Sequence, residues 1–203
     1  MKLSRLQVVR RRIGTVLMDL RYGAILKGRI ESRYEHLGAV LTDNTGYDVL
    51  PILFSDLVTE KDVLVDVGCG KGRVINWWLS VYPGNRLYGI ELDDVIAERT
   101  RRRLKKYKNV AILTGDACDL IPREATMFYL YNPFRSEVME RFMAELVKHP
   151  RSSEGAIRRL VCFHFTYERL FENNRNFEVM KRLTIDRRPP IQCAVIRTVD
   201  RSV

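Results

Sequence analysis

The sequence has no long hydrophobic run, few histidines and no closely spaced pair of cysteines. No apolar stretch approaches the roughly 20 residues that a helix needs to cross a bilayer, so we expect no transmembrane segment. The three histidines lack the spacing of zinc ligands, so we expect no metal. The four cysteines are scattered among apolar or motif segments, at positions 69, 118, 162 and 193, and are typical of reduced, buried thiols in a cytoplasmic protein.

The apolar stretch 13–18 near the basic N-terminus is short and is broken by Asp19. No small-residue cleavage site follows it, which argues against a secretory signal, and the chain shows no internal repeat. With 203 residues, 46% hydrophobic and 30% charged, the chain fits one ordinary folded domain. We expect a single domain over 1–203, with a helical, basic extension over 1–58 that covers a core over 59–203.

Positive charge is in excess, with a net charge of +10. Residues 1–33 hold nine Lys or Arg against two acids, and residues 98–108 hold seven against one. Such an excess attracts nucleic acid, an anionic membrane or an acidic partner, or it belongs to a solvated face. No RNA-binding motif with interleaved aromatics and no DNA-reading module accompanies it, so both readings stay open.

The first helix is expected over 3–20, where apolar residues recur at helical spacing beside a cluster of arginines at 10–12. These apolar residues are Leu3, Leu6, Val9, Ile13, Val16, Leu17 and Leu20. A basic amphipathic helix can lie on a membrane surface, but it more often packs on its own domain. We favour packing on the domain.

From residue 62 the pattern alternates between strands and helices, after a turn-rich break at 42–48 and an apolar helix over 49–57. Strands are expected at 63–67, 86–91, 110–114, 127–131 and 160–165, and helices at 73–81, 94–106, 136–148 and 167–171. This alternation predicts an α/β fold, a doubly wound, mostly parallel sheet with helices on both faces. Two further β-like runs, 177–185 and 191–199, predict a C-terminal antiparallel hairpin.

The most informative feature is the turn that follows the first strand. An acid, Asp66, ends the apolar run, and glycines follow at 68, 70 and 72 before the next helix. Glycines let the backbone approach a ligand closely, and a helix N-terminus binds polar or negative groups. The turn is typical of a site for a nucleotide-like cofactor.

Polar residues also follow the next three strands, where an open α/β sheet binds its ligands. Glu91 closes its strand 21 residues after Gly70, and an acid there can accept both hydroxyls of a ribose. Asp116 follows the third strand, where it can meet an adenine amino group or merely brace a turn. Tyr131-Asn-Pro-Phe134 ends the fourth, and its proline directs the chain out of the sheet.

In this combination, from about Asp62 to the hairpin, the chain resembles the class I S-adenosylmethionine-dependent methyltransferases, and Asp-Val-Gly-Cys-Gly-Lys-Gly-Arg with Tyr-Asn-Pro-Phe is similar to a group of bacterial members. The resemblance implies a Rossmann-like sheet of seven strands. It implies that the glycine turn holds the methionine part of the cofactor, that Glu91 binds the ribose and that Asp116 and Ala117 bind the adenine. The residues it places at the cofactor are Asp66, Gly68, Cys69, Gly70, Gly72, Glu91, Leu92, Asp116, Ala117 and Asn132.

The rival cofactor is NAD. Its usual fingerprint has the third glycine three residues after the second, where this chain has Arg73. The turn reads G-x-G-x-G instead, and the C-terminal hairpin is more similar to that of a methyltransferase. We therefore expect S-adenosylmethionine.

Candidates for the acceptor side are Asn132, Pro133 and Phe134, which resemble the Asp/Asn-Pro-Pro-aromatic motif of methyltransferases that act on planar amino groups. Phe134 replaces the second proline of that motif, so amino-group specificity is not implied. The alternative to an acceptor site is a turn that ends the strand, with Phe134 packed in the core. His164 is either a base or a core histidine, and Arg73 and Arg135 are either anion ligands or surface arginines.

The sequence thus predicts methyl transfer from S-adenosylmethionine by in-line displacement to an unidentified acceptor. The sulfonium is already a strong electrophile, so catalysis needs mainly positioning and exclusion of water. Two alternatives stay open: an RNA or DNA methyltransferase that uses the basic surface, and a binding module that keeps the cofactor fold without catalysis.

Overall fold

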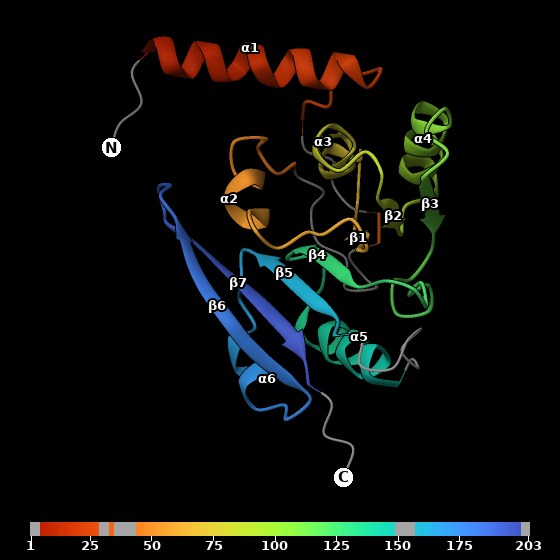
Figure 1. Cartoon of the computed structure of the whole chain (residues 1–203), viewed down its shortest axis with the longest axis vertical. Coiled ribbons are helices and arrows are strands. Elements are labelled where there is room, and N and C mark those ends of the chain that lie inside the picture. Colours follow the sequence, from red (N-terminus) through yellow and green to blue (C-terminus); the bar gives the residue numbers. More distant parts are fainter. Residues whose placement is uncertain (1–4, 29–32, 35–43, 149–156, 200–203) are drawn as a thin grey trace.

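The protein forms a seven-stranded sheet with helices on both faces in a computed structural model, which describes residues 5–28, 33–34, 44–148 and 157–199 (Figure 1). The helices are α1 (Arg5–Arg21), α2 (Leu50–Phe54), α3 (Arg73–Val81), α4 (Asp94–Leu104), α5 (Ser136–Lys148) and α6 (Glu168–Glu172). The strands are β1 (Val63–Val67), β2 (Arg86–Glu91), β3 (Val110–Thr114), β4 (Met127–Tyr131), β5 (Arg159–Phe163), β6 (Phe177–Ile185) and β7 (Ile191–Thr198).

The strand order is β3-β2-β1-β4-β5-β7-β6. The first five strands pair in parallel, and β7 is antiparallel to both β5 and β6. The predicted parallel sheet and C-terminal hairpin are confirmed. The order reverses beside β1, and in a doubly wound sheet the ligand binds at the carboxyl ends of the strands near such a reversal.

Alternate residues of each strand pack into two separate cores, as the pleat of a strand requires. Leu64 of β1 packs with α2, α3 and α4 on one face of the sheet. Its neighbour Val65 packs on the other face with α5 and α6. The large rings Trp78 and Phe142 are fully buried at the centres of these cores, so the helices hold the sheet rigid below the site.

After α1, three elements have an end that differs by two or more residues from the one expected from the sequence. β5 ends at Phe163 rather than at residue 165, because His164 has a φ of 59° and a left-handed residue cannot continue a strand. The helix expected over 49–57 spans only Leu50–Phe54, and the helix expected to reach residue 106 ends at Leu104. All three differences concern element ends.

α1 lies outside these layers and crosses one end of the molecule, beside α3 and the tip of the β6–β7 hairpin (Figure 1). The expected start of this helix, at residue 3, lies outside the described residues. Among the described residues no helix is long and apolar enough to span a membrane.

A buried ion pair anchors α1. Asp19 is fully buried and accepts hydrogen bonds from the Arg73 guanidinium, with Nη2 at 2.8 Å and Nε at 3.3 Å. Its carboxylate also accepts from the Tyr47 hydroxyl at 2.8 Å and from the Leu26 backbone N–H at 3.0 Å. Four donors on one carboxylate satisfy a charge that would otherwise be costly to bury.

Asp19→Asn is expected to lower the free energy of unfolding by about 2 to 4 kcal/mol, because it removes one charge and leaves the Arg73 guanidinium buried without its counterion. The measurement is urea unfolding at neutral pH. Asp48→Asn is the control, since Asp48 pairs with Arg11 in a more exposed setting and its loss should cost about 1 kcal/mol or less. Equal effects of the two substitutions would contradict the anchoring role of Asp19.

Candidate functional site

The glycine turn after β1 is fastened to the end of β2. The backbone N–H groups of Gly68 and Cys69 both donate to the Ile90 carbonyl, each at 2.9 Å. Gly72 then adopts a φ of 73° and directly precedes α3, so the turn delivers the N-terminus of that helix to the carboxyl edge of the sheet. This is the strand–turn–helix arrangement that the sequence predicts.

Two of the glycines are required by space as well as by conformation. Gly68 has a φ of 73°, and a Cβ there would lie 3.2 Å from the Pro133 Cβ. A Cβ on Gly72 would lie 2.9 Å from the Thr100 Cγ2. The turn therefore packs directly against the chain that leaves β4 on one side and against α4 on the other.

Glu91 at the end of β2 is held by the turn itself. Its Oε2 accepts a hydrogen bond from the Gly70 N–H at 2.8 Å, and its Oε1 accepts from the Asp93 N–H at 2.9 Å. The side chain is only 7% exposed, and burial raises the pKa of its carboxyl. Leu92, the next residue, is half-buried. Glu91 therefore holds the glycine turn in place at the edge where it is expected to meet a ribose.

Asp66 is the unusual residue of the site. It is only 3% exposed, and no described residue donates a hydrogen bond to its carboxyl. Burial, followed by the nearby charge of Glu91, raises the pKa of Asp66 to about 8. A buried carboxyl without donors is costly unless a ligand supplies them, so Asp66 marks a position suited to a cationic or hydrogen-bond-donating group.

Asp116, after β3, differs because its carboxylate is already engaged. It accepts a hydrogen bond from the Cys118 N–H at 2.9 Å and forms an ion pair with Arg141. Ala117 beside it is buried. The Gly115 N–H donates to the Glu91 carbonyl at 3.0 Å, which keeps the ends of β2 and β3 together.

The ends of β4 and β5 carry two side chains on left-handed backbone. Asn132 has a φ of 40° and His164 a φ of 59°, and such residues often mark functional sites. Asn132 Oδ1 accepts a hydrogen bond from the Thr166 hydroxyl at 3.1 Å. The His164 ring stacks on Tyr131, with ring centroids 5.6 Å apart, and no described residue forms a hydrogen bond with it.

The structure places the rest of the Asn-Pro-Phe turn as follows. Pro133 lies against the glycine turn, whereas the Phe134 ring is buried and packs on Phe142 at 5.5 Å. The Phe134 carbonyl accepts the Tyr167 hydroxyl at 3.0 Å. The Phe134 ring therefore lies in the core, whereas Asn132 and Pro133 lie at the carboxyl edge of the sheet.

Sequence reasoning missed two arginines that join the N-terminal segment to the site. Arg73 is neither a surface arginine nor a free anion ligand, because it is 11% exposed and paired with Asp19. Arg103 belongs to the basic stretch 98–108, for which a solvated face was one of the two readings, yet its guanidinium donates to the carbonyls of Tyr22 and Lys71, each at 2.7 Å. The only signal in the sequence was Asp19, an acid inside a basic helix.

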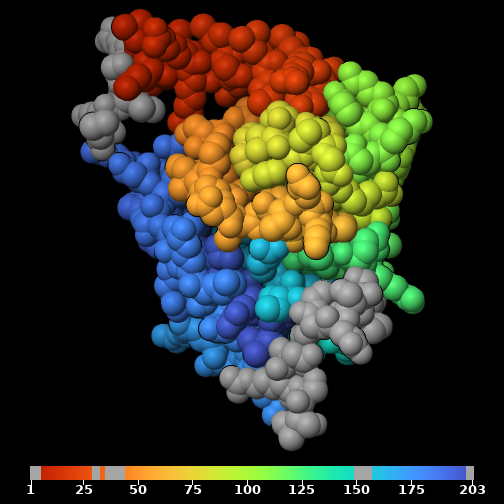
Figure 2. All heavy atoms as spheres, in the orientation of Figure 1, coloured from red at the N-terminus to blue at the C-terminus, as the bar shows by residue number. Residues whose placement is uncertain are grey.

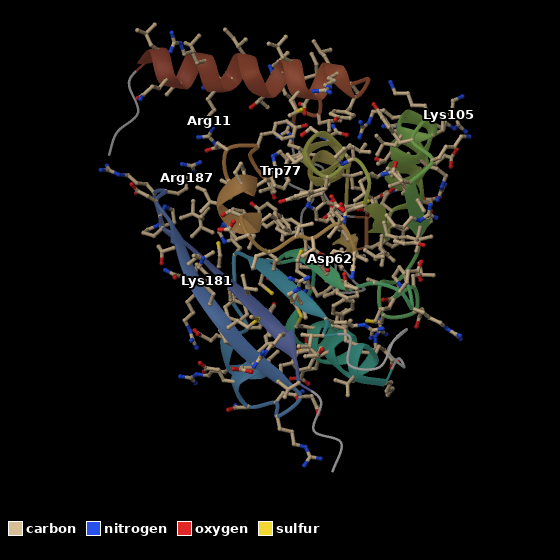
Figure 3. The ribbon with its side chains drawn as sticks, in the orientation of Figure 1. Arg11, Asp62, Trp77, Lys105, Lys181 and Arg187 are labelled. Carbon is tan, nitrogen blue, oxygen red and sulfur yellow. The ribbon has the colours of Figure 1, made fainter. Side chains whose placement is uncertain are left out.

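A cavity of about 730 Å³ lies at the end of β6, and none of Asp66, Glu91, Asp116, Asn132 and His164 lines it. It lies beneath the first half of α1, between that helix, the segment 47–52 and the tip of the β6–β7 hairpin (Figure 2). Arg11 reaches into it from α1 and Arg187 from the hairpin, and both pair with Asp48 (Figure 3). Among the described residues no group of three or more His, Cys, Asp or Glu could hold a metal ion.

Comparison with known proteins decides the family. A family model described as "Methyltransferase domain" matches residues 64–152, which include the glycine turn, Glu91, Asp116 and Asn132. The chain contains a class I S-adenosylmethionine-dependent methyltransferase domain. This confirms the resemblance on which the sequence analysis relied.

Individual relatives of the methyltransferase domain differ in their acceptors. The chain is 30% identical over 80 residues to a probable cobalt-precorrin-6B C(15)-methyltransferase (decarboxylating) of Archaeoglobus fulgidus, covering 39% of this chain and 47% of that protein. The chain thus spans about half the length of this curated relative.

Two solved structures share the fold of the methyltransferase domain. An RNA methyltransferase from Salinibacter ruber in complex with S-adenosyl-L-homocysteine has a TM-score of 0.58 at 24% identity, covering 81% of this chain and 96% of that one. The mitomycin 7-O-methyltransferase MmcR has a TM-score of 0.60 at 16% identity, covering 76% of this chain and 55% of that one. At these identities the likeness shows the fold alone.

Asp66→Asn is expected to stabilise the protein without ligand, and increasingly so at higher pH. The pKa of Asp66 is raised from 3.8 to about 8, so the folded state holds its proton while the unfolded chain releases it. Stability is therefore highest below the unfolded pKa and falls as the pH rises toward the folded pKa. The side-chain amide introduced by Asp66→Asn cannot ionise, so the variant does not lose stability in this way as the pH rises.

The measurement is urea unfolding of both proteins at about pH 5 and about pH 8. Asp119→Asn, which changes an exposed acid, is the control and should show no such trend. A stability difference between Asp66→Asn and the wild type that does not grow with pH would refute the raised pKa of Asp66.

Proposed function

We propose that this protein transfers a methyl group from S-adenosylmethionine to an acceptor bound at the ends of β4 and β5. The observation that carries the proposal is the buried Asp66 carboxyl, which lacks a donor among the described residues and lies next to the glycine turn of a methyltransferase domain. S-adenosylmethionine supplies a sulfonium-activated methyl group when it is bound.

The charge of the site supports this cofactor over a dinucleotide. Asp66 and Glu91 are both buried acids at the carboxyl edge, and Arg73 at the start of α3 is neutralised by Asp19. A pyrophosphate would meet two carboxyls and no free cation from that helix start. The ammonium and the hydroxyl groups of S-adenosylmethionine donate hydrogen bonds, which the Asp66 carboxyl lacks and which the Glu91 carboxylate can accept in addition to its two backbone donors.

We assign the residues of the site accordingly. Asp66 and the turn Gly68–Gly72, with Cys69 and Gly70, hold the methionine part, Glu91 and Leu92 lie at the ribose, and Asp116 and Ala117 lie at the adenine. Arg141 already occupies one oxygen of Asp116, so the backbone beside Ala117 is the better candidate for the adenine contact. No metal is needed for this chemistry.

The residues on the acceptor side act by positioning. Asn132 and Pro133 hold the acceptor near the glycine turn, while Phe134 supports them from the core. His164 presents a ring without a hydrogen-bond partner among the described residues, so it is available to take a proton from an acceptor that must lose one.

The acceptor itself stays a matter of proposal. The RNA and small-molecule enzymes that share the fold give no preference, and the net charge of +10 is compatible with an RNA or DNA acceptor. A nucleic-acid acceptor predicts methyl transfer that weakens strongly with salt.

Calorimetry is expected to show binding of S-adenosylhomocysteine and no comparable binding of NAD. Glu91→Gln should weaken S-adenosylhomocysteine about tenfold or more, since hydrogen bonds to a charged group contribute about 1.5 to 3 kcal/mol. Asp119→Asn is the control with unchanged affinity. Equal affinity for both ligands, or an unaffected Glu91→Gln, would show that the cofactor assignment is wrong.

Methyl transfer is tested with labelled cofactor and a cell extract in a single turnover. Asn132→Gly removes the side chain but keeps a residue suited to a φ of 40°. Transfer should fall by about tenfold to a hundredfold, because misplacing the acceptor slows reaction without weakening the cofactor. Thr184→Ala, an exposed change at the rim of the cavity, is the control for general damage to the edge. Tight cofactor binding with no labelled fraction in any extract would instead indicate a non-catalytic module.

A further inference from the structure

α1 exposes a continuous stripe of large apolar side chains. Its members recur every three or four residues and are each between 51% and 75% exposed: Leu6, Val9, Ile13, Leu17 and Leu20. This spacing places them on one side of the helix. The expectation that α1 packs on its own domain is therefore confirmed only for the opposite side, which carries the buried Asp19.

The inner side of α1 carries polar side chains together with Met18, which packs against the core formed with α2 and α3. Asp19 pairs with Arg73, Thr15 and Arg11 line the cavity, and Arg11 pairs with Asp48. Figure 3 shows Arg11 directed from α1 toward the body of the protein. The apolar stripe of five residues thus faces away from the core of the protein, whereas the stripe of an amphipathic surface helix usually faces inward.

Arginines flank the apolar stripe on both sides. At 100° per residue, Arg10 and Arg21 project along one margin of the stripe and Arg12 along the other, and all three are exposed. The acid of this helix, Asp19, is buried on the inner side. The outer surface of α1 therefore combines apolar side chains with positive charge alone.

We propose that α1 docks this protein on an anionic membrane surface. The stripe would enter the boundary between headgroups and acyl chains, and the arginines at its margins would contact anionic headgroups. α1 forms one edge of the molecule and projects as a ridge, so a flat surface can contact it along its length (Figures 1 and 2).

Charge separates this occupant from the others. A second copy of the helix would bring arginines against arginines at both margins, which costs rather than stabilises. A nucleic acid would use the arginines but would leave five large apolar side chains facing water. An anionic bilayer satisfies both features at once. The inference does not depend on the methyl acceptor.

The experiment is co-sedimentation of the full chain with vesicles of phosphatidylcholine, with or without about one-third phosphatidylglycerol, at about 0.1 M salt. Binding is expected only to the vesicles that contain phosphatidylglycerol, and it should weaken as salt is raised. Ile13→Gln with Leu17→Gln should lower the partition coefficient about tenfold or more. Arg10→Gln with Arg12→Gln should lower it by a similar factor.

Matched controls carry the same changes elsewhere. Val95→Gln with Val147→Gln alters two exposed apolar residues on α4 and α5. Arg99→Gln with Lys105→Gln removes two exposed charges, one from α4 and one from the residue that follows it. Both control proteins should bind vesicles as the wild type does, and circular dichroism should show that all variants are folded.

Three results would overturn the proposal. The first is no binding to phosphatidylglycerol vesicles. The second is equal binding by the wild type and by the Ile13→Gln, Leu17→Gln protein. The third is that the wild type forms a dimer in solution and the Ile13→Gln, Leu17→Gln protein does not. The stripe would then be an interface between two copies of the chain.

Discussion

The carboxylate of Asp19 is the group on which the arrangement of the site depends. It is fully buried, and its strongest partner is Arg73, the first residue of α3 and the next residue after the glycine turn. The pair fixes two things at once. It determines which side of α1 faces the protein, and it neutralises the arginine at the start of α3. A helix start that would attract a phosphate is thereby left for a ligand of another charge.

The site is acidic although the protein as a whole is basic. Asp66 and Glu91 lie at the carboxyl edge with little solvent, and only Glu91 has backbone donors. Burying a carboxyl without a donor opposes folding, so the residue is explained by what it does for a ligand rather than for stability. The excess of positive charge, by contrast, lies on outer surfaces such as that of α1, where it is free to act on a partner.

Most of the fold was predictable because it follows from local patterns. The apolar runs and glycines mark β1 and α3, and the alternation of strands with helices leads to a parallel sheet and a terminal hairpin. Contacts between distant segments were not predictable. Arg73 looked like a surface residue because its partner lies 54 positions earlier in the sequence. Phe134 and His164 each had two possible roles, one in the core and one at the acceptor. The backbone conformation at the strand ends decides between these roles.

The outward direction of the apolar stripe on α1 was also not predictable from the sequence. Helical spacing identifies α1 as amphipathic, but a sequence does not say which side faces inward. A stripe of five apolar residues is ordinarily the inner side. Here a single acid within the helix, paired with an arginine from another element, reverses that orientation and turns the stripe outward. Because the same pair joins α1 to the start of α3, a surface that binds α1 also holds the cofactor turn at a defined distance and orientation from itself.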